Sequence, residues 1–363
     1  MSHRLFAVDH QATSQYWQPV ARTRITAAKR SFATRRIDVS LAAGLIVADA
    51  RPMPGDLVLA RVDMLGQHRR LESPDGRRAA LDCGDEILVV YGNRYAPDQF
   101  EAAVPESLAS CSLVAGGGIA AEVLSKCCRM KNATKITPLG LVVDADGKRL
   151  NTQTFAIPEP AGRQRPPVVV AIVGSSMNAG KTTTMASLVR GEAASGMRVG
   201  AAKITGTGSG GDLWSYKDAG AAVVLDFTDA GHPSTAGLDA AALQRTLATL
   251  VGRLAAEKVD IAFIEIADGL LFEDTANLVT SALFRSLVDS VVFAAGDAMG
   301  ALFGATWLHR QGLPLSAISG ALTASPLAIR EVESQTDIPV VGIEAMINGE
   351  FLLSALTARS IVA

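Results

Sequence analysis

A glycine, a lysine and a threonine stand together in the segment 174-GSSMNAGKTTT-184. They follow the apolar run 167–174 and open a segment of helical composition, which is the order found in phosphate-binding loops. In the usual pattern a first glycine stands five positions before the second, and here Ser175 fills that position. We still expect phosphate contacts, because the N–H groups of a tight turn and of a helix start surround anionic oxygens without that glycine.

This loop is predicted to hold a nucleoside triphosphate with Mg²⁺. Lys181 would reach the β- and γ-phosphates, and the Thr182 hydroxyl would be a ligand of Mg²⁺, which prefers oxygen. ATP is the expected nucleotide, with GTP left open. The predicted nucleotide-binding residues are Ser175, Ser176, Asn178, Ala179, Gly180, Lys181, Thr182 and Thr183.

A second candidate group lies in 203-KITGTGSGGD-212, after the next apolar strand. Ligands of open α/β sheets bind at the carboxyl ends of the strands, so Lys203, Thr207 and Asp212 should lie beside the phosphate loop. A lysine there can neutralise a transferring phosphoryl group, and an aspartate can bind Mg²⁺ or accept a proton. A flexible, glycine-rich surface loop is the alternative interpretation.

A single carboxylate, Glu265, interrupts the apolar strand in 259-VDIAFIEIADG-269. An isolated buried carboxylate is costly unless it is paired or lies near a cation. We therefore expect Glu265 to complete a Mg²⁺ site with Thr182 and Asp212, the alternative being a salt-bridged structural glutamate.

The segment 226-DFTDAGHPSTAG-237 follows the third strand of this half. His232 is predicted to be catalytic, and His232 or Asp229 to orient a substrate. A loop in which Ser234 or Thr235 caps the following helix explains the same residues equally well. Both interpretations stay open at this point.

These candidates need a scaffold of alternating buried strands and helices, and the sequence predicts one. Nearly continuous apolar runs joined by helices are typical of a parallel sheet covered on both faces, a three-layer α/β domain. Together with the phosphate-binding loop after its first strand, this predicts a P-loop NTPase domain with a mostly parallel sheet. The predicted strands are 167–174, 198–206, 221–228, 259–268, 289–296, 315–322 and 338–343, and the clearest predicted helices are 180–195, 237–257 and 299–311.

The proline-rich segment 152–166 predicts a linker that separates a smaller β-rich domain, 1–151, from the P-loop domain, 167–363. Short β-like runs and a turn signal at Pro74-Asp75-Gly76 indicate an antiparallel sheet or barrel before the linker. Residues 106–131 are predicted to be helical, with a turn or break at the glycine triplet 116–118.

Composition limits the classes of function. With 34 basic and 36 acidic residues, the net charge of −2 gives no overall attraction to nucleic acid or anionic membranes. The basic stretch 20–36 is expected to be a solvated helix, with an RNA contact as the alternative. Without a long apolar run or paired cysteine spacing, we expect a cytoplasmic protein with reduced thiols. The adjacent Cys127 and Cys128 are expected to lie on a helix, with a redox-active pair as the alternative interpretation.

The second half resembles the dethiobiotin synthetase group of P-loop enzymes over about 167–345. The resemblance lies in GKTTT, in K-x-x-x-T-G from Lys203 to Gly208, in the strand with Glu265, and in VVFAAGDAMGAL and IPVVGI. It implies phosphate and Mg²⁺ binding by Lys181 and Thr182, a substrate and γ-phosphate contact by Lys203, Mg²⁺ ligation by Asp212 and Glu265, and commonly a dimer.

Three segments depart from that group. EIADG replaces the usual E-G-A-G-G, SAISGALTAS lacks the asparagine that reads the base, and GSSMNAG replaces G-T-D-T-x-x-G. The chain is also similar to a two-domain P-loop family typified by a D-glutamate N-acetyltransferase, in which a β-rich domain precedes such a unit.

The leading hypothesis is an ATP-dependent enzyme that phosphorylates a small carboxylate-type substrate, through Lys181, Lys203, Asp212 and His232. One rival is a nucleotide-dependent switch whose first domain binds a partner. Another, implied by the second resemblance, is an acyltransferase.

Overall fold

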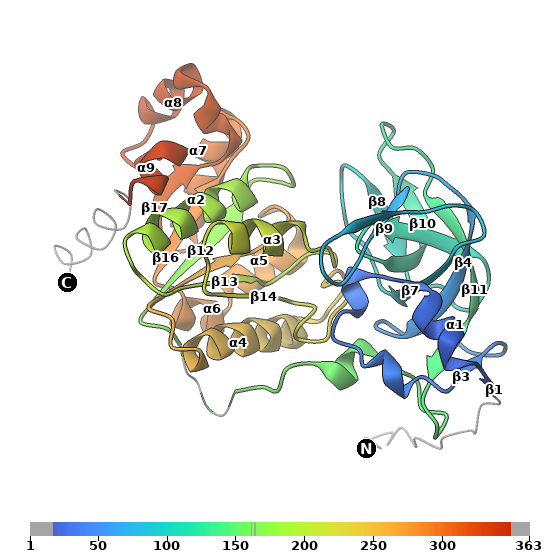
Figure 1. Ribbon diagram of the computed structural model, residues 1–363. Coiled ribbons are helices and arrows are strands. Elements are labelled where there is room, and N and C mark those ends of the chain that lie inside the picture. Colours follow the sequence, from blue (N-terminus) through green and yellow to red (C-terminus); the bar gives the residue numbers. More distant parts are fainter. Residues whose placement is uncertain (1–16, 161, 163–164, 350–363) are drawn as a thin grey trace, which may run out of the picture.

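The computed structural model of the chain describes residues 17–160, 162 and 165–349. Two bodies of different composition lie side by side, a β-rich one formed by the first part of the chain and an α/β one formed by the second (Figure 1).

The α/β body has a six-stranded sheet in the order β14-β13-β15-β12-β16-β17, and all strand pairings of this sheet among the described residues are parallel. The predicted parallel sheet is therefore confirmed. Its strands are β12 (Val168–Gly174), β13 (Val199–Lys203), β14 (Val223–Asp226), β15 (Ile261–Glu265), β16 (Ser290–Ala294) and β17 (Leu315–Ser319).

Helices cover both faces of this sheet and bury two apolar cores. One core includes Leu247 and Leu250 of α4, and the other includes Met185 of α2 and Tyr216 of α3. The three-layer architecture follows from this double burial. The helices are α2 (Lys181–Ala194), α3 (Gly211–Asp218), α4 (Ala240–Ala256), α5 (Glu273–Thr280), α6 (Ala282–Leu287), α7 (Ala298–Arg310), α8 (Pro326–Glu333) and α9 (Ile343–Ile347), with a 3₁₀ turn η4 (Ala321–Ala324).

One predicted strand and one of the alternatives left open for this body are wrong. The segment 338–343 forms no strand; Val340 makes a single bridge to Ile318 before α9 begins. Neither Ser234 nor Thr235 caps α4, because the Asp239 side chain accepts from Ala242 N at 2.7 Å.

The β-rich body closes on itself. Strand β11 pairs with β4, β4 with β7, β7 with β10, β10 with β9, and β9 returns to β11. We call this body the barrel. Its strands are β1 (Gln18–Pro19), β2 (Lys29–Arg30), β3 (Gly44–Ile46), β4 (Leu57–Met64), β7 (Glu86–Tyr91), β8 (Phe100–Ala103), β9 (Cys111–Ala115), β10 (Ile119–Lys126) and β11 (Thr134–Val143). In addition, β5 (Arg70–Glu72) pairs antiparallel with β6 (Arg78–Ala80) across the predicted turn at Pro74-Asp75-Gly76.

The prediction of a helix over 106–131 is wrong, because β9 and β10 occupy that segment. Strand β10 pairs with β7, β8 and β9, so tertiary pairing outweighs the local helical preference of its alanine, glutamate and lysine residues. The glycine triplet turns the chain between the two strands, with Gly118 at φ +99°. Cys127 and Cys128 follow β10 outside any helix, and both are free thiols.

The basic stretch 20–36 is not one solvated helix. Helix α1 covers only Arg22–Ala27, and three 3₁₀ turns, η1 (Phe32–Thr34), η2 (Val39–Leu41) and η3 (Thr152–Phe155), complete the helical part of the barrel. Lys29 pairs with Asp85 and Arg24 with Glu86. Several positive charges of this stretch are therefore paired with carboxylates of the same chain and are not available to an RNA.

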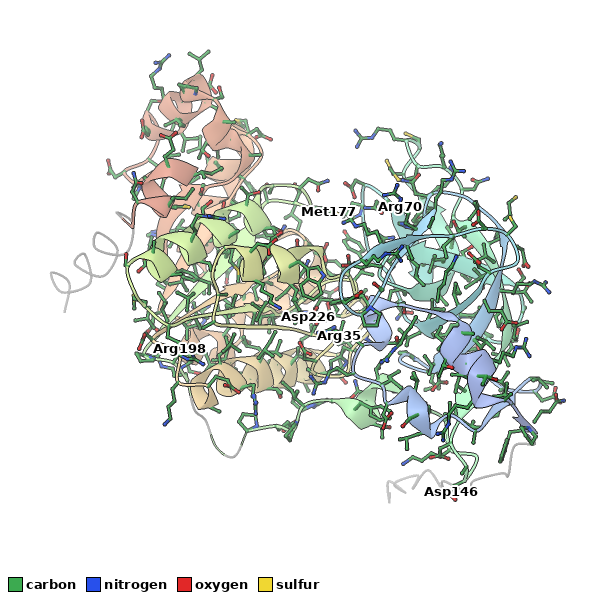
Figure 2. All side chains as sticks on the ribbon, viewed as in Figure 1. Arg35, Arg70, Asp146, Met177, Arg198 and Asp226 are labelled. Atoms are coloured by element: carbon green, nitrogen blue, oxygen red, sulfur yellow. The ribbon has the colours of Figure 1, made fainter. Side chains whose placement is uncertain are left out.

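The barrel packs against the α/β body beside the carboxyl ends of its strands. Arg35 forms ion pairs with Asp226, which ends β14, and with Asp229, at 2.9 and 2.7 Å (Figure 2). The Tyr95 ring stacks on Phe272 with centroids 3.9 Å apart. In the segment predicted as a linker, the Thr152 hydroxyl donates to Gly231 O at 2.7 Å. No helix in the described part of the chain has both the length and the apolar character that a membrane crossing requires.

Candidate functional site

The loop between β12 and α2 has the backbone of a tight anion-binding turn. Asn178 and Gly180 have φ values of +63° and +96°. A Cβ on Gly180 would lie 2.7 Å from Ala321 N and 2.9 Å from Gly320 Cα, so only glycine fits there. Helix α2 begins at Lys181, directly after this glycine, and presents its free N–H groups toward the loop.

The Lys181 side chain folds back across the loop. Its Nζ donates to Ser176 O at 2.8 Å and to Asp268 O at 2.9 Å. Burial lowers the pKa of Lys181, while the charges of Glu265 and Asp268 act against this. Two neutral carbonyl oxygens satisfy a buried ammonium only in part, so the lysine can exchange them for anionic phosphate oxygens.

Strands β13 and β15 bring two of the predicted residues together, because Lys203 and Glu265 are register partners at the carboxyl ends of these parallel strands. Helix α3 adds Asp212, which pairs with Lys203 and accepts from Thr182 Oγ1 at 2.9 Å. Thr182 Oγ1 also lies 3.2 Å from Glu265 Oε2. A hydroxyl and two carboxylates thus meet at one point.

The charges of this cluster stabilise one another. Burial acts to lower the pKa of Lys203, but Asp212 and Glu265 outweigh it and the pKa is raised. Burial likewise acts to raise the pKa of Asp212, yet Lys203 holds it below its usual value. Both groups are therefore charged at neutral pH.

Tyr216 is a member of this cluster that the sequence analysis did not identify. Its hydroxyl donates to Glu265 Oε2, and burial together with the charge of Glu265 raises its pKa well above the usual value. The tyrosine therefore stays protonated and remains a donor. Its position four residues after Asp212, on the same helix face, is a signal that could have identified it.

The cluster fits Mg²⁺ bound together with a nucleotide. Thr182, Asp212 and Glu265 offer oxygen atoms, the ligands that Mg²⁺ prefers. Within the described ranges, no group of three or more histidine, cysteine or acidic residues is arranged to hold a metal ion. Phosphate oxygens and water would therefore have to complete the coordination of Mg²⁺, as is common for this ion.

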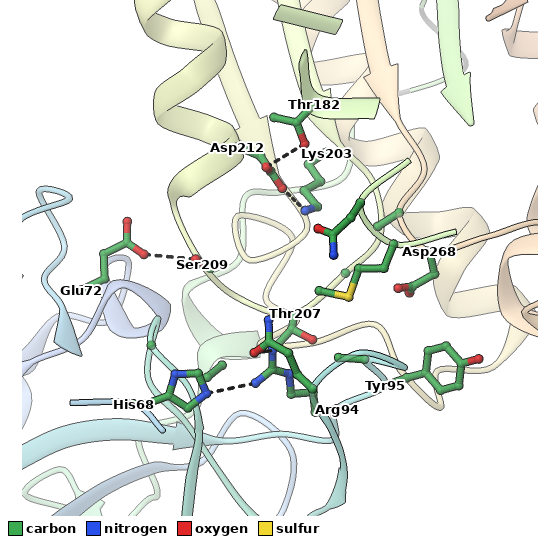
Figure 3. A pocket seen from close by; sticks show the side chains of 18 of the residues that line it. His68, Glu72, Arg94, Tyr95, Thr182, Lys203, Thr207, Ser209, Asp212 and Asp268 are labelled. Atoms are coloured by element: carbon green, nitrogen blue, oxygen red, sulfur yellow. Dashed lines mark hydrogen bonds and ion pairs between the residues drawn. The ribbon is translucent and has the colours of Figure 1, made fainter. Parts of the chain in front are cut away.

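A cavity of about 900 Å³ lies between this cluster and the barrel (Figure 3). Its α/β wall includes Asn178, Gly180, Lys181, Thr182, Thr183, Lys203, Thr207, Asp212, Glu265 and Asp268. Its barrel wall includes His68, Arg69, Arg70, Glu72, Arg78 and Arg94, which the sequence analysis did not link to the site.

Arg94 is the buried cation of the barrel wall, only 6% exposed. Its Nη2 donates to Gln99 Oε1 at 2.8 Å, whereas its Nε has no hydrogen-bond partner among the described residues. Burial lowers the pKa of Arg94 to about 10, so it is still charged at neutral pH. Burial, and then the charge of Arg94, lowers the pKa of His68 to about 4, so the imidazole is neutral.

Four predicted site residues lie outside this cavity. His232 does not line it; its Nδ1 is 3.0 Å from Gln153 Nε2. Ser175 and Ser176 line a second hollow of about 340 Å³ next to it, and Ala179 is buried beneath the loop.

Asp229, the predicted alternative to His232 for orienting substrate, also lies outside this cavity. Its carboxylate binds Arg35 and Arg36 of the barrel, at 2.7 and 3.2 Å. The segment 226–237 therefore holds the two bodies together instead of lining the cavity.

No protein-family model matches the chain, and no curated protein sequence matches it. Among solved structures, the signal recognition particle receptor FtsY from Elizabethkingia anophelis is similar, at 15% identity and a TM-score of 0.35 over 55% of this chain and 67% of that one. Chloroplast FtsY from Physcomitrella patens gives 21% identity and a TM-score of 0.35 over 54% and 68%. The kinase domain of Escherichia coli tyrosine kinase ETK is similar at 14% identity and a TM-score of 0.33, over 42% of this chain and 66% of that one. The resemblance to the dethiobiotin synthetase group stays a prediction.

Proposed function

We propose that the chain binds a Mg²⁺–nucleoside triphosphate at the loop 175–183 and transfers its terminal phosphoryl group to a small carboxylate-type acceptor in the cavity. One observation carries this proposal. Lys181 and Lys203 share one wall of the cavity with the oxygen cluster of Thr182, Asp212 and Glu265, and Arg94 lies on the opposite wall.

The loop supplies the contacts that a triphosphate requires. The backbone N–H groups of the turn and the positive end of α2 surround the phosphates, and Lys181 gives up its carbonyl contacts to reach them. Thr182, Asp212 and Glu265 would hold Mg²⁺, which neutralises charge on the phosphate oxygens when it is bound.

Transfer to a carboxylate suits the groups that are present. One carboxylate oxygen forms a bond to the γ-phosphorus, the bond from that phosphorus to the bridging oxygen breaks, and its electron pair leaves with the nucleoside diphosphate. The product is an acyl phosphate. A carboxylate has no proton to lose, so this reaction needs no general base, in keeping with the position of His232 outside the cavity. Lys203 offsets the charge on the transferring group.

The barrel wall favours an acidic acceptor. Arg94 is buried and keeps an unused Nε donor, and a guanidinium matches a carboxylate geometrically. The exposed arginines Arg69, Arg70 and Arg78 add positive charge at the same wall and attract anions into the cavity.

Nucleotide binding is tested by titrating ATP with MgCl₂ into the protein and its Lys181→Ala variant in a calorimeter. The variant should lose measurable binding, while Lys148→Ala, a control on an exposed barrel turn, should bind as the original chain does. Retained ATP binding by Lys181→Ala would contradict the proposal. The same titration with GTP decides which base is preferred.

The acceptor class is tested by following nucleoside diphosphate release in the presence of small carboxylic acids. We expect such acids to accelerate release from the original chain, and Arg94→Gln to weaken the apparent affinity for the acid without preventing ATP binding. Stimulation by RNA or by a protein instead of an acid would favour the switch hypothesis.

A further inference from the structure

Helix α3 has two faces that serve different parts of the molecule. Asp212 and Tyr216 lie four residues apart and share the face toward the oxygen cluster, where they contact Thr182 and Glu265. Trp214 lies between them in sequence and about 200° around the helix from Asp212, at about 100° per residue. Its side chain therefore points away from the cluster, toward the barrel.

The barrel holds this second face through Glu72, at the end of β5. Trp214 Nε1 donates to Glu72 Oε1 at 3.1 Å, and Gly210 N and Ser209 Oγ donate to Glu72 Oε2 at 3.0 and 3.2 Å (Figure 3 shows the Ser209 contact). Phe32 of the barrel also packs edge-on against the Trp214 ring, with centroids 6.5 Å apart.

Glu72 is a buried carboxylate, 4% exposed, and among the described residues it forms no ion pair. Its charge is stabilised by the three donors of segment 209–214 and by the positive end of α3. A buried carboxylate without a cation is costly when it loses its donors, so these contacts fix segment 209–214 firmly against the barrel.

The segment needs such support from outside. Four glycines, Gly206, Gly208, Gly210 and Gly211, lie between Lys203 and Asp212, and glycine-rich backbone loses more conformational entropy when it is ordered than other backbone does. The barrel reaches this backbone closely, because a Cβ added to Gly117 would lie 2.0 Å from Gly208 O. The contacts with the barrel therefore hold Asp212 in place before a nucleotide or Mg²⁺ binds.

We propose that Glu72 is a positioning residue for Asp212: the barrel, through Glu72 and Trp214, sets the place of the α3 carboxylate that Mg²⁺ uses in the nucleotide complex. This inference rests on the proposed function, since it concerns the Mg²⁺ role given there to Asp212. It assigns to the barrel a part in metal binding, in addition to forming one wall of the cavity.

The test compares ADP affinity in excess MgCl₂ with ADP affinity in EDTA, measured by calorimetry on the full chain. The ratio of the two gives the enhancement by Mg²⁺. Glutamine at position 72 keeps one acceptor oxygen and replaces the other by a donor, so Glu72→Gln should reduce this enhancement by about tenfold, as is typical for groups that orient a metal ligand. ADP affinity in EDTA should stay unchanged. Glu106→Gln, an exposed barrel carboxylate, is the matched control and should retain the full enhancement.

A double-variant cycle separates positioning from a general loss of structure. Asp212→Asn removes the charged oxygen, so Glu72→Gln added to Asp212→Asn should reduce the enhancement no further. Should Glu72→Gln fail to fold, Trp214→Phe keeps the ring against Phe32 and removes one of the donors, and a reduction of about threefold is expected.

The outcomes distinguish the two proposals. No ADP binding by the original chain, with or without Mg²⁺, overturns the proposed function. If the original chain shows the enhancement and Glu72→Gln retains it in full, the positioning role is wrong while the proposed function stands. An equal loss of ADP affinity in MgCl₂ and in EDTA also overturns the positioning role, because it would show that Glu72 only stabilises the fold.

Discussion

Replacing Arg35 by methionine removes the guanidinium that lies between two buried carboxylates at the junction of the two bodies. The Arg35 side chain is 14% exposed, and those of Asp226 and Asp229 are 2% and 6% exposed. Methionine keeps much of the length and apolar volume of the side chain, so the variant mainly tests the charge.

The expected loss in the free energy of unfolding depends on the hydrogen bonds and ion pairs that Asp226 and Asp229 keep in the variant. Removing one partner of a buried ion pair costs about 3–5 kcal/mol of the free energy of unfolding. Asp226 would still accept from Thr228 N at 2.8 Å, and Asp229 would still reach Arg36 Nη1 at 3.2 Å. Because both carboxylates keep a partner, we expect a loss at the lower end of that range, about 3 kcal/mol at neutral pH.

The pH dependence has a definite sign. Burial raises the pKa of Asp229 above its usual value, and Arg35 acts against this rise. Without Arg35 the pKa rises further, so the folded variant binds a proton at a higher pH than the unfolded chain does. The variant therefore regains stability as the pH falls from neutral toward that raised pKa, and its deficit relative to the original chain shrinks.

Urea unfolding followed by tryptophan fluorescence at about pH 7 and about pH 5 measures both effects. Arg51→Met is the control, because its pair with Glu106 is exposed on both sides and should contribute less than about 1 kcal/mol. Adding Asp226→Asn and Asp229→Asn to Arg35→Met should restore part of the loss. The prediction is refuted if Arg35→Met loses as little free energy of unfolding as Arg51→Met does. It is also refuted if the loss relative to the original chain grows as the pH falls.

Two further predictions concern the cavity. The pKa of His68 falls from 6.5 to about 4, so the folded chain binds fewer protons than the unfolded chain between these values and loses up to about 3 kcal/mol of stability as the pH drops through this window. His68→Gln should flatten that acid limb in urea unfolding; an unchanged limb would show that another group causes it. Gly180→Ala should weaken ATP binding at least tenfold in calorimetry, because φ +96° strains alanine by about 1–2 kcal/mol and its Cβ meets the backbone at Gly320 and Ala321. Unchanged affinity would mean that the loop accepts a side chain there.

The α/β body was largely predictable because its signals are local. Apolar strands with helices between them identify a parallel sheet, and the carboxyl ends of such strands meet at one edge. The register of β13 with β15 then brings Lys203 to Glu265 as expected. The helix predicted over 106–131 failed because β10 gains its stability from three partner strands, which the sequence of β10 alone does not reveal.

The barrel side of the cavity could not be predicted for a different reason. Arg94 and Glu72 look like ordinary barrel residues until the docking of the two bodies is known, and the docking depends on distant pairs such as Arg35 with Asp226. In the same docked arrangement Asp229 pairs with Arg35 and Arg36 of the barrel and does not line the cavity. A carboxylate in a loop at the edge of a sheet can serve a site or an interface, and only the position of its cation decides between the two.

The docking also explains how a glycine-rich segment can hold the Asp212 carboxylate in a fixed position. The backbone from Gly206 to Gly211 gives little order to Asp212 by itself, but Gly208 N donates to Pro233 O at 2.9 Å, and Glu72 holds Ser209 and Gly210. The glycines allow this segment to pass close to the barrel backbone at Gly117. The contacts formed there then restrict the conformational freedom of the segment. Order at Asp212 is thus a property of both bodies together, and substitutions at their junction should be expected to affect the cluster without touching it.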